Sequence, residues 1–314
     1  MASPGPGKFN QVNDVLSKPD VQLAQCQLLL LFTYKMTLQG WKESGLLDRE
    51  VRYYCHLVEA LNHISFLTYG VRDKNYEGLT SPISVWPRPE SIGAFRFSLT
   101  APSIYPDLFK RATIIKSNQS LGAWTGLIAR CHLPDKLFVV RCGWVRTGEM
   151  MRRDERLSGL SLWWAQLVEK LDFVAADAII VTTEADRSYL AGIYGIDPDK
   201  IYIIPNSIDT DLFRPVGSHS PSDWQSQFTA MCVSRFDAMK NLDQVILALK
   251  GMKNCKELIL VGDGPQRPYL EELARLTGVP VCFVGRVANH QLPDLLRKTN
   301  IFIMPRLMDQ ACLK

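Results

Sequence analysis

Short apolar runs and helix-like segments alternate along almost the whole chain of 314 residues. Short apolar runs are typical of strands buried on both faces, and the segments between them have the length of helices. The predicted strands of the first series are residues 26–34, 64–69, 92–99, 113–116, 137–141, 177–182 and 201–204. Those of the second series are residues 229–234, 258–261, 281–284 and 301–304. Strands that alternate with helices form parallel sheets covered on both faces, so the pattern predicts an α/β fold.

The composition changes between the two series. Residues 213–227 contain Pro215, Gly217, Pro221 and several serines, with no helix or strand period, which is typical of a linker. The sequence therefore predicts an N-terminal domain at residues 1–212, a linker at 213–227 and a C-terminal domain at 228–314. Both are expected to be doubly wound, Rossmann-like sheets. The second is expected to be incomplete, since such sheets usually have about six strands.

Charge and cysteine content exclude several classes of protein. The 36 Lys and Arg residues against 32 Asp and Glu give a net charge of +4, and no basic run is longer than two residues, so a nucleic-acid partner is not expected. No two of the eight cysteines have CxxC spacing, and Cys26, Cys232 and Cys282 fall in predicted strands, which favours buried free thiols. The first residues lack the pattern of a signal peptide, and no apolar run could span a membrane. A cytoplasmic protein is expected.

The residues that follow the strands of the second series carry the strongest functional signal. In open parallel sheets, ligands bind beyond the carboxyl ends of the strands. Arg235 follows the first of these strands, and Lys240 comes just before a predicted helix. Two cations beside the N–H groups of a helix N-terminus are suited to a polyphosphate. The alternative is a solvated loop that happens to be basic.

The next two strands end in a glycine turn and in an arginine. Gly262 and Gly264 would let the backbone bend and approach a ligand, although they match neither a dinucleotide fingerprint nor a P-loop. A plain turn between a strand and a helix explains them equally well. Arg286 follows the third strand and is placed to reach the same region beyond the carboxyl ends of the strands.

Four segments in this order resemble the retaining glycosyltransferases of family 4, whose architecture is the two-domain GT-B fold. The matching segments are Ile204-Pro205-Asn206-Ser207-Ile208-Asp209, Ser234-Arg235-Phe236 with Lys240-Asn241, Gly262-Asp263-Gly264-Pro265, and Phe283-Val284-Gly285-Arg286-Val287. An apolar strand that ends in Pro305 follows them, as in the family. The resemblance is specific over residues 176–305 and rests mainly on pattern over residues 20–170.

The resemblance implies a hexosyltransferase-type enzyme that moves a sugar from a UDP- or GDP-linked donor to a carbohydrate or lipid-linked acceptor. Arg235 and Lys240 would hold the donor diphosphate and stabilise it as the leaving group. Gly262, Gly264 and Arg286 would lie near the nucleoside. The family implies retention of configuration and no requirement for a metal or another cofactor.

Two departures from the family pattern stand out. Ser207 replaces the usual glycine, and a serine in a left-handed conformation costs about 1 kcal/mol. The family also places two glutamates eight residues apart soon after the strand that ends in proline, and this sequence has no such pair. The expectation is therefore a truncated chain that lacks the donor-sugar contacts of that segment. The alternative function is a non-catalytic member that binds only nucleotide or a partner; a Rossmann dehydrogenase is disfavoured by the missing glycine fingerprint.

The first series offers fewer signals. Asn118 and Gln119 follow one predicted strand and Arg141 follows another, so these side chains are acceptor-side candidates, against the alternative of ordinary loop polarity. Arg152, Arg153 and Arg156 precede a helix that bears Trp163 and Trp164. Either this helix contacts a membrane surface that carries a lipid-linked acceptor, or its two tryptophans face the protein core.

Overall fold

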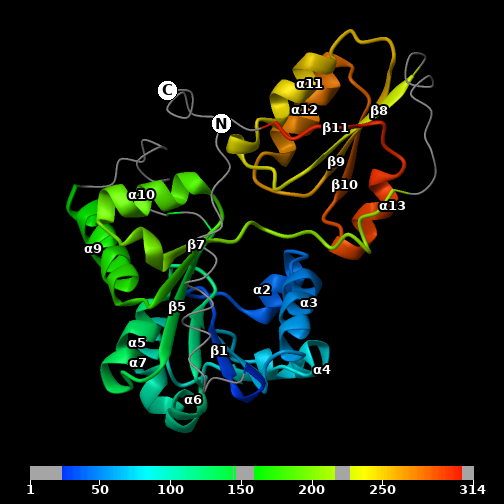
Figure 1. Cartoon of the computed structure of the whole chain (residues 1–314). Helices are drawn as coiled ribbons and strands as arrows, with labels where there is room; N and C mark the ends of the chain where they lie inside the picture. The colour runs from blue at the N-terminus through cyan, green and yellow to red at the C-terminus, as the bar shows by residue number, and fades with distance from the viewer. Residues whose placement is uncertain (1–22, 144, 146–158, 216–226, 306–314) are drawn as a thin grey trace, which may run out of the picture. The chain divides into compact units, whose positions relative to one another are not determined.

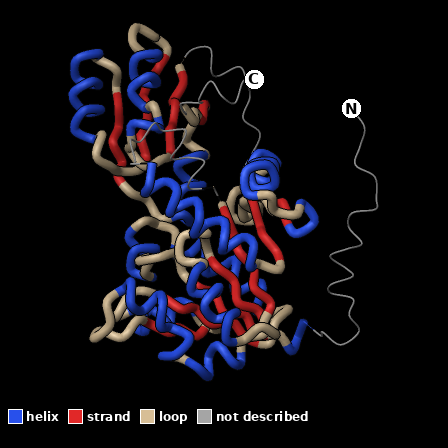
Figure 2. Tube along the Cα trace, turned by 90° about the vertical axis from the view of Figure 1, so that its left-hand side faces the viewer, coloured by secondary structure: helices blue, strands red, loops and turns tan. Residues whose placement is uncertain are grey.

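The computed structural model describes residues 23–143, 145, 159–215 and 227–305 (Figure 1). The chain forms two compact units. Unit 1 comprises Met1–Trp41 and Glu50–Asn206, and unit 2 comprises Lys42–Arg49 and Ser207–Lys314. Each contains one parallel sheet with helices beside it (Figure 2), which confirms the predicted α/β class.

Unit 1 is built on seven parallel strands in the order β3-β2-β1-β4-β5-β6-β7. Their bounds are β1 Gln27–Leu31, β2 His63–Thr68, β3 Ser84–Pro87, β4 Ile114–Ser117, β5 Leu137–Cys142, β6 Ala178–Val181 and β7 Ile201–Ile203. Six of them lie where the sequence predicts a strand. The prediction missed β3, a short strand at the edge of the sheet whose last residue, Pro87, is untypical of strand interiors.

The helices between these strands are α2 Leu38–Glu43, α3 Leu47–Val58, α4 Glu77–Thr80, α5 Ala94–Ile104, α6 Pro106–Arg111, α7 Trp124–His132, α9 Gly159–Ala175 and α10 Glu184–Tyr194. The end of α2 and the start of α3 fall in the segment Lys42–Arg49, which belongs to unit 2. Helix α7 packs against both α5 and α9. Thr183 caps the N-terminus of α10, because its Oγ1 accepts a hydrogen bond from the backbone N–H of Asp186 at 3.1 Å.

The predicted strand at residues 92–99 is wrong, because α5 occupies most of this segment. Phe97 and Ala101 are four residues apart and both are buried, as on the inner face of a helix. A short apolar run does not by itself distinguish a strand from a buried helix.

Unit 2 has four parallel strands in the order β10-β9-β8-β11. The strands are β8 Phe228–Val233, β9 Cys255–Val261, β10 Val281–Gly285 and β11 Ile301–Phe302, and the helices are α11 Leu242–Leu249, α12 Arg267–Thr277 and α13 Leu292–Leu296. Alternate residues of β8, including Ala230 and Cys232, pack with Ile246 and Leu260 in one buried cluster. All four strands were predicted.

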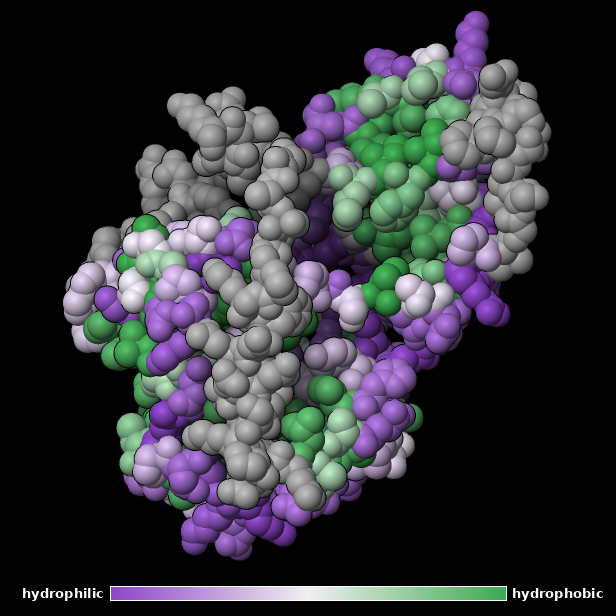
Figure 3. Space-filling model, in the orientation of Figure 1, coloured by the Kyte–Doolittle hydropathy of each residue, from purple (hydrophilic) through white to green (hydrophobic). Residues whose placement is uncertain are grey.

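Some apolar residues of unit 2 are exposed. Ile301 and Phe302 of β11 are 36% and 49% exposed, and hydrophobic surface gathers around this strand in Figure 3. Cys282 is also exposed, which corrects the expectation that it is buried, whereas Cys26 and Cys232 are buried as predicted. The prediction for Cys282 was wrong because β10 is an edge strand in the described part of the chain and its alternate residues Cys282 and Val284 are exposed on one face.

Candidate functional site

The turns after β8, β9 and β10 meet at one end of the strands of the unit 2 sheet. The three strands are parallel neighbours, so their carboxyl ends lie side by side. Backbone hydrogen bonds join the turns: Phe236 N–H donates to Asp263 O at 3.0 Å, and Gly262 N–H donates to Gly285 O at 2.7 Å. The segments that carry Arg235, Gly262 and Arg286 are thus brought together, as the sequence predicts.

Arg235 projects from the first of these turns. Its side chain is 73% exposed, and its Nε donates to Oδ2 of Asp237. The Asp237 side chain is 24% exposed. The sequence points to Asp237 only through its position two residues after Arg235. The carboxylate holds one edge of the guanidinium and leaves its terminal amino groups directed elsewhere, where they could bind an anion in the fork geometry typical of arginine.

Lys240 lies two residues before α11. It ends a short 3-10 turn, Ala238–Lys240, and the next residue, Asn241, has a left-handed conformation with φ of 52°. This turn brings the chain into α11 at Leu242. The lysine is therefore beside the positive end of a helix, where an anion is favoured by the helix dipole as well as by the ammonium charge.

The two glycines of the second turn are required by packing within the protein. Gly262 has φ of 134°, and a Cβ atom there would lie 1.8 Å from Ser234 O. A Cβ atom on Gly264 would lie 2.6 Å from Phe236 O. Only glycine allows the turns after β8 and β9 to approach this closely. A contact with a nucleoside at these residues stays a prediction.

Arg286 is exposed and follows Gly285, whose φ is 83°. The left-handed glycine redirects the chain at the end of β10 and thereby sets the direction in which Arg286 leaves the sheet. Arg267, at the start of α12, lies over the ring of Phe283 at 5.9 Å and pairs with Glu271 at 2.8 Å. It is a further cation on this side of the unit that the sequence did not single out.

In unit 1, the structure brings the three acceptor-side candidates together. Arg141 Nη1 donates to Asn118 O at 3.3 Å, and Gln119 Oε1 accepts from Gly143 N–H at 2.9 Å. Arg141 Nη2 also donates to Asn206 Oδ1 at 2.9 Å. Polar side chains therefore join the end of β5 to the loop after β4, and Asn118 is buried. Arg141, the charged residue among the three candidates, lies within β5 rather than after it and is half-buried.

Lys116 begins the segment 116–119 that the sequence places beside a possible acceptor, but the sequence did not predict its burial. It lies near the end of β4, is 8% exposed, and its Nζ donates to Tyr54 Oη at 3.0 Å. Burial, followed by the charge of Arg141, lowers the pKa of Lys116 to about 7. Burial also raises the pKa of Tyr54. The only signal in the sequence is a lysine that directly follows two isoleucines in a predicted strand.

The expectation of left-handed strain at Ser207 needs correction. Among the described residues, the non-glycine residues with positive φ are Lys35 and Asn241, so Ser207 carries no left-handed strain. The local turn is stabilised instead by Asp209, whose Oδ1 accepts from the N–H groups of Asp211 and Leu212, each at 3.0 Å.

The aromatic pair of α9 does not face the core. Trp163 and Trp164 are 52% and 54% exposed, with ring centroids 4.9 Å apart. Arg152, Arg153 and Arg156 lie outside the described residues, as does most of the predicted linker at 213–227. Within the described part of the chain, no helix has the length and apolar character needed to cross a membrane.

Comparisons with known proteins identify relatives of both parts of the chain. A family model described as "Glycosyltransferase Family 4" matches residues 52–212, more than half of the chain. A second, described as "Glycosyl transferases group 1", matches residues 220–313. The chain is also similar to two curated proteins. The putative glycosyltransferase EpsF of Bacillus subtilis is 28% identical over 45% of this chain and 39% of its own length. The alpha-maltose-1-phosphate synthase of Mycobacterium tuberculosis is 26% identical over 71% of this chain and 61% of its own length.

Solved structures share the fold. Anabaena Alr3699/HepE in complex with UDP has a TM-score of 0.62 at 19% identity, over 90% of this chain and 74% of that one. Sucrose-phosphate synthase from Thermosynechococcus elongatus has a TM-score of 0.65 at 17% identity, over 90% and 76%. The chain spans between 39% and 61% of the length of the two curated relatives named above. On the match to its family model, the chain belongs to glycosyltransferase family 4.

Proposed function

We propose that the protein is a glycosyltransferase that takes a sugar from a nucleotide-sugar donor. The observation that carries this proposal is the placement of Arg235 and Lys240 in the loop between β8 and the N-terminus of α11. Both cations precede a helix whose dipole also favours an anion, and the diphosphate of a nucleotide-sugar is such an anion. The related structure of Alr3699/HepE, described in complex with UDP, supports the choice of a nucleoside diphosphate.

In this mechanism, the two cations act when the bond between the sugar and the diphosphate breaks. Negative charge develops on the leaving diphosphate, and Arg235 and Lys240 stabilise it through charge-assisted hydrogen bonds that are already positioned. Asp237 orients the Arg235 guanidinium. We further propose, on the family alone, that transfer proceeds with retention and that the diphosphate is stabilised without a metal ion.

The acceptor is proposed to bind unit 1. Asn118 and Gln119 follow β4, and Arg141 is the penultimate residue of β5, so all three lie at the carboxyl ends of these strands, where ligands bind in open parallel sheets. A carbohydrate or a lipid-linked sugar fits the polar character of these loops. Gly262, Gly264 and Arg286 are proposed to lie beside the nucleoside.

Replacing Arg235 by alanine should weaken the binding of UDP or GDP by roughly 10- to 150-fold, because a hydrogen bond to a charged group contributes about 1.5–3 kcal/mol. Calorimetric titration of the two nucleotides into both proteins measures this. Arg275→Ala is the matched control, since Arg275 is an exposed arginine of the same unit that pairs with Glu272 on α12. Equal affinity of the Arg235 variant and the wild type would remove Arg235 from the site.

Turnover separates the proposed enzyme from a protein that only binds nucleotide. The full chain is incubated with a panel of UDP- and GDP-sugars and simple sugar acceptors, and release of the nucleoside diphosphate is followed. We expect release with at least one donor, and a marked loss of it in the Lys240→Ala variant. Tight nucleotide binding without release from any donor would favour the non-catalytic alternative.

A further inference from the structure

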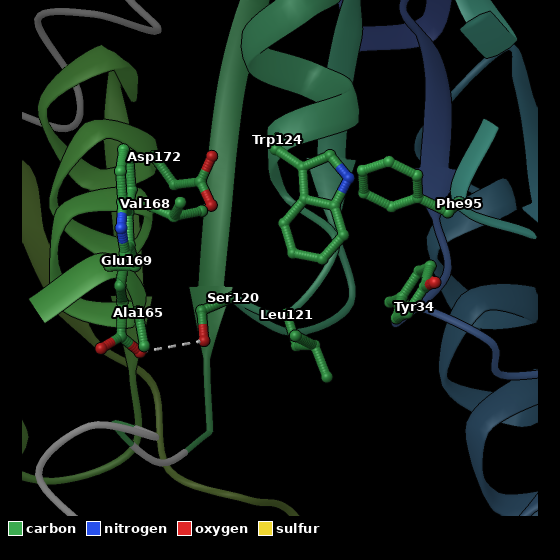
Figure 4. Close-up of a pocket in the computed structure, with 10 residues that line it drawn as sticks. Tyr34, Phe95, Ser120, Leu121, Trp124, Ala165, Val168, Glu169 and Asp172 are labelled. Atoms are coloured by element: carbon green, nitrogen blue, oxygen red, sulfur yellow. Dashed lines mark hydrogen bonds between the residues drawn. The ribbon is translucent and has the colours of Figure 1, made fainter. Parts of the chain in front are cut away.

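A cavity of about 400 Å3 lies within unit 1 (Figure 4). Its lining comes from the segment after β1, from the loop between β4 and α7, and from α5, α7 and α9. Most of the wall is aromatic or aliphatic and includes Tyr34, Leu121, Trp124, Trp164 and Val168. The volume is within the range of small-molecule sites, which are mostly apolar with a few polar groups.

Apolar side chains on the rim of this cavity are exposed. Phe95 is 64% exposed and Trp164 is 54% exposed, and both line the cavity. A ligand with an apolar body would remove this surface from water as it enters.

An acidic pair lies on the α9 side of the cavity. Glu169 is 6% exposed and accepts hydrogen bonds from Tyr194 Oη at 2.8 Å and Ser120 Oγ at 3.4 Å. Asp172 is 1% exposed, and its carboxyl group points from α9 toward Trp124 in Figure 4. Among the residues that the structure describes, its Oδ1 has no hydrogen-bond partner.

Trp124 carries a second polar atom without a partner. Its ring packs against Tyr34 with centroids 5.4 Å apart, and its buried Nε1 finds no acceptor in the described part of the chain. Buried polar atoms in folded proteins are nearly always hydrogen-bonded. Two such atoms on residues that line one cavity indicate that a ligand with hydrogen-bonding groups belongs there.

The charge state of the acid pair selects among ligands. Burial, reinforced by the neighbouring Glu169, raises the pKa of Asp172 well above its usual range. The raised pKa favours the neutral form of Asp172, which offers one donor and one acceptor, the complement of a hydroxyl group. An anionic ligand would be repelled by Glu169. An ammonium ion would be attracted by Glu169 and by the tryptophan rings, but this attraction would have to offset the larger cost of removing its hydration shell in a buried site.

We propose that this cavity binds an uncharged apolar alcohol, with its apolar body against Trp124 and Leu121 and its hydroxyl hydrogen-bonded to Asp172. The proposal rests on unit 1 alone and does not depend on Arg235, Lys240 or sugar transfer.

Four probes of one shape test the proposal with the full chain: 2-naphthylmethanol, 2-ethylnaphthalene, 2-naphthoate and 2-naphthylmethylamine. Their dissociation constants are measured by ligand-observed NMR titration near neutral pH. We expect the alcohol to bind at least tenfold more tightly than each of the other three. No saturable binding of the alcohol, or equal or tighter binding of the hydrocarbon, the anion or the amine, would overturn the proposal.

Variants of α9 assign the preference to Asp172. Asp172→Leu should bind the alcohol and the hydrocarbon equally, whereas Asp172→Asn, which keeps a donor and an acceptor, should retain the preference. Leu171→Ala changes an exposed side chain of the same helix that does not line the cavity, and it should leave all four constants unchanged. Circular dichroism confirms that each variant is folded. A preference that persists in Asp172→Leu would show that the hydroxyl binds elsewhere.

Discussion

Replacing Gly262 by alanine should destabilise unit 2 by about 2–6 kcal/mol, the combined cost of backbone strain and forced packing. The added Cβ atom would lie 1.8 Å from Ser234 O at a residue with φ of 134°, so the turns after β8 and β9 would have to separate. Hydrogen–deuterium exchange of the β8 and β9 peptides measures the effect. Their protection should fall by about 30-fold or more.

Gly278→Ala is the matched control for this change. Gly278 ends α12 with φ of 72°, and no atom lies within 4 Å of the position its Cβ would take. This variant should therefore lose only about 1–2 kcal/mol, the cost of the left-handed conformation. Equal destabilisation by the two substitutions would mean that crowding against Ser234 adds nothing to the cost of replacing Gly262.

Replacing Lys116 by methionine should change how the stability of unit 1 depends on pH. In the unfolded chain a lysine has a pKa near 10.4, whereas burial lowers the pKa of Lys116 to about 7 in the folded protein. Between these values the unfolded chain binds a proton that the folded chain does not, so wild-type stability rises with pH. Below about pH 7 both states are protonated and the penalty is complete. The methionine variant should be the more stable protein at pH 7.

The difference in the free energy of unfolding between the Lys116→Met variant and the wild type should shrink by about 3 kcal/mol from pH 7 to pH 9.5. Urea unfolding followed by tryptophan fluorescence measures it, because six of the seven tryptophans precede residue 207. Lys170→Met, at an exposed position of α9, should shift stability by a similar small amount at every pH. A constant gap between wild type and Lys116→Met would show that Lys116 is protonated in the folded state throughout this range.

Local sequence patterns predicted most strands of both sheets and the loop that carries Arg235 and Lys240. The strand before Arg235 and the helix after Lys240 both have clear apolar patterns, and a parallel sheet necessarily brings the ends of neighbouring strands together. The edge strand β3 and the helix α5 were not predicted, because short apolar segments carry little periodicity. Edge position also explains why Cys282 was misjudged.

Properties that depend on tertiary packing could not be read from the sequence. The partner of Lys116 is Tyr54, 62 positions away in the chain, and the pKa of this lysine depends on burial by several strands and helices. Asp172 likewise lines a cavity only because α9 packs beside α7. Gly262 was predicted to favour ligand approach, whereas the structure shows that the neighbouring turn already requires the glycine.

Hydrogen–deuterium exchange of the wild-type chain, with and without saturating UDP or GDP, tests the nucleotide site most directly. If unit 2 holds the donor diphosphate, the nucleotide should slow exchange in residues 234–241, 262–266 and 285–287, which follow β8, β9 and β10. The edge strand β3 of unit 1 serves as an internal reference and should not change. Slower exchange confined to unit 1, or no change at saturating nucleotide, would contradict the assignment of the donor site to these three turns.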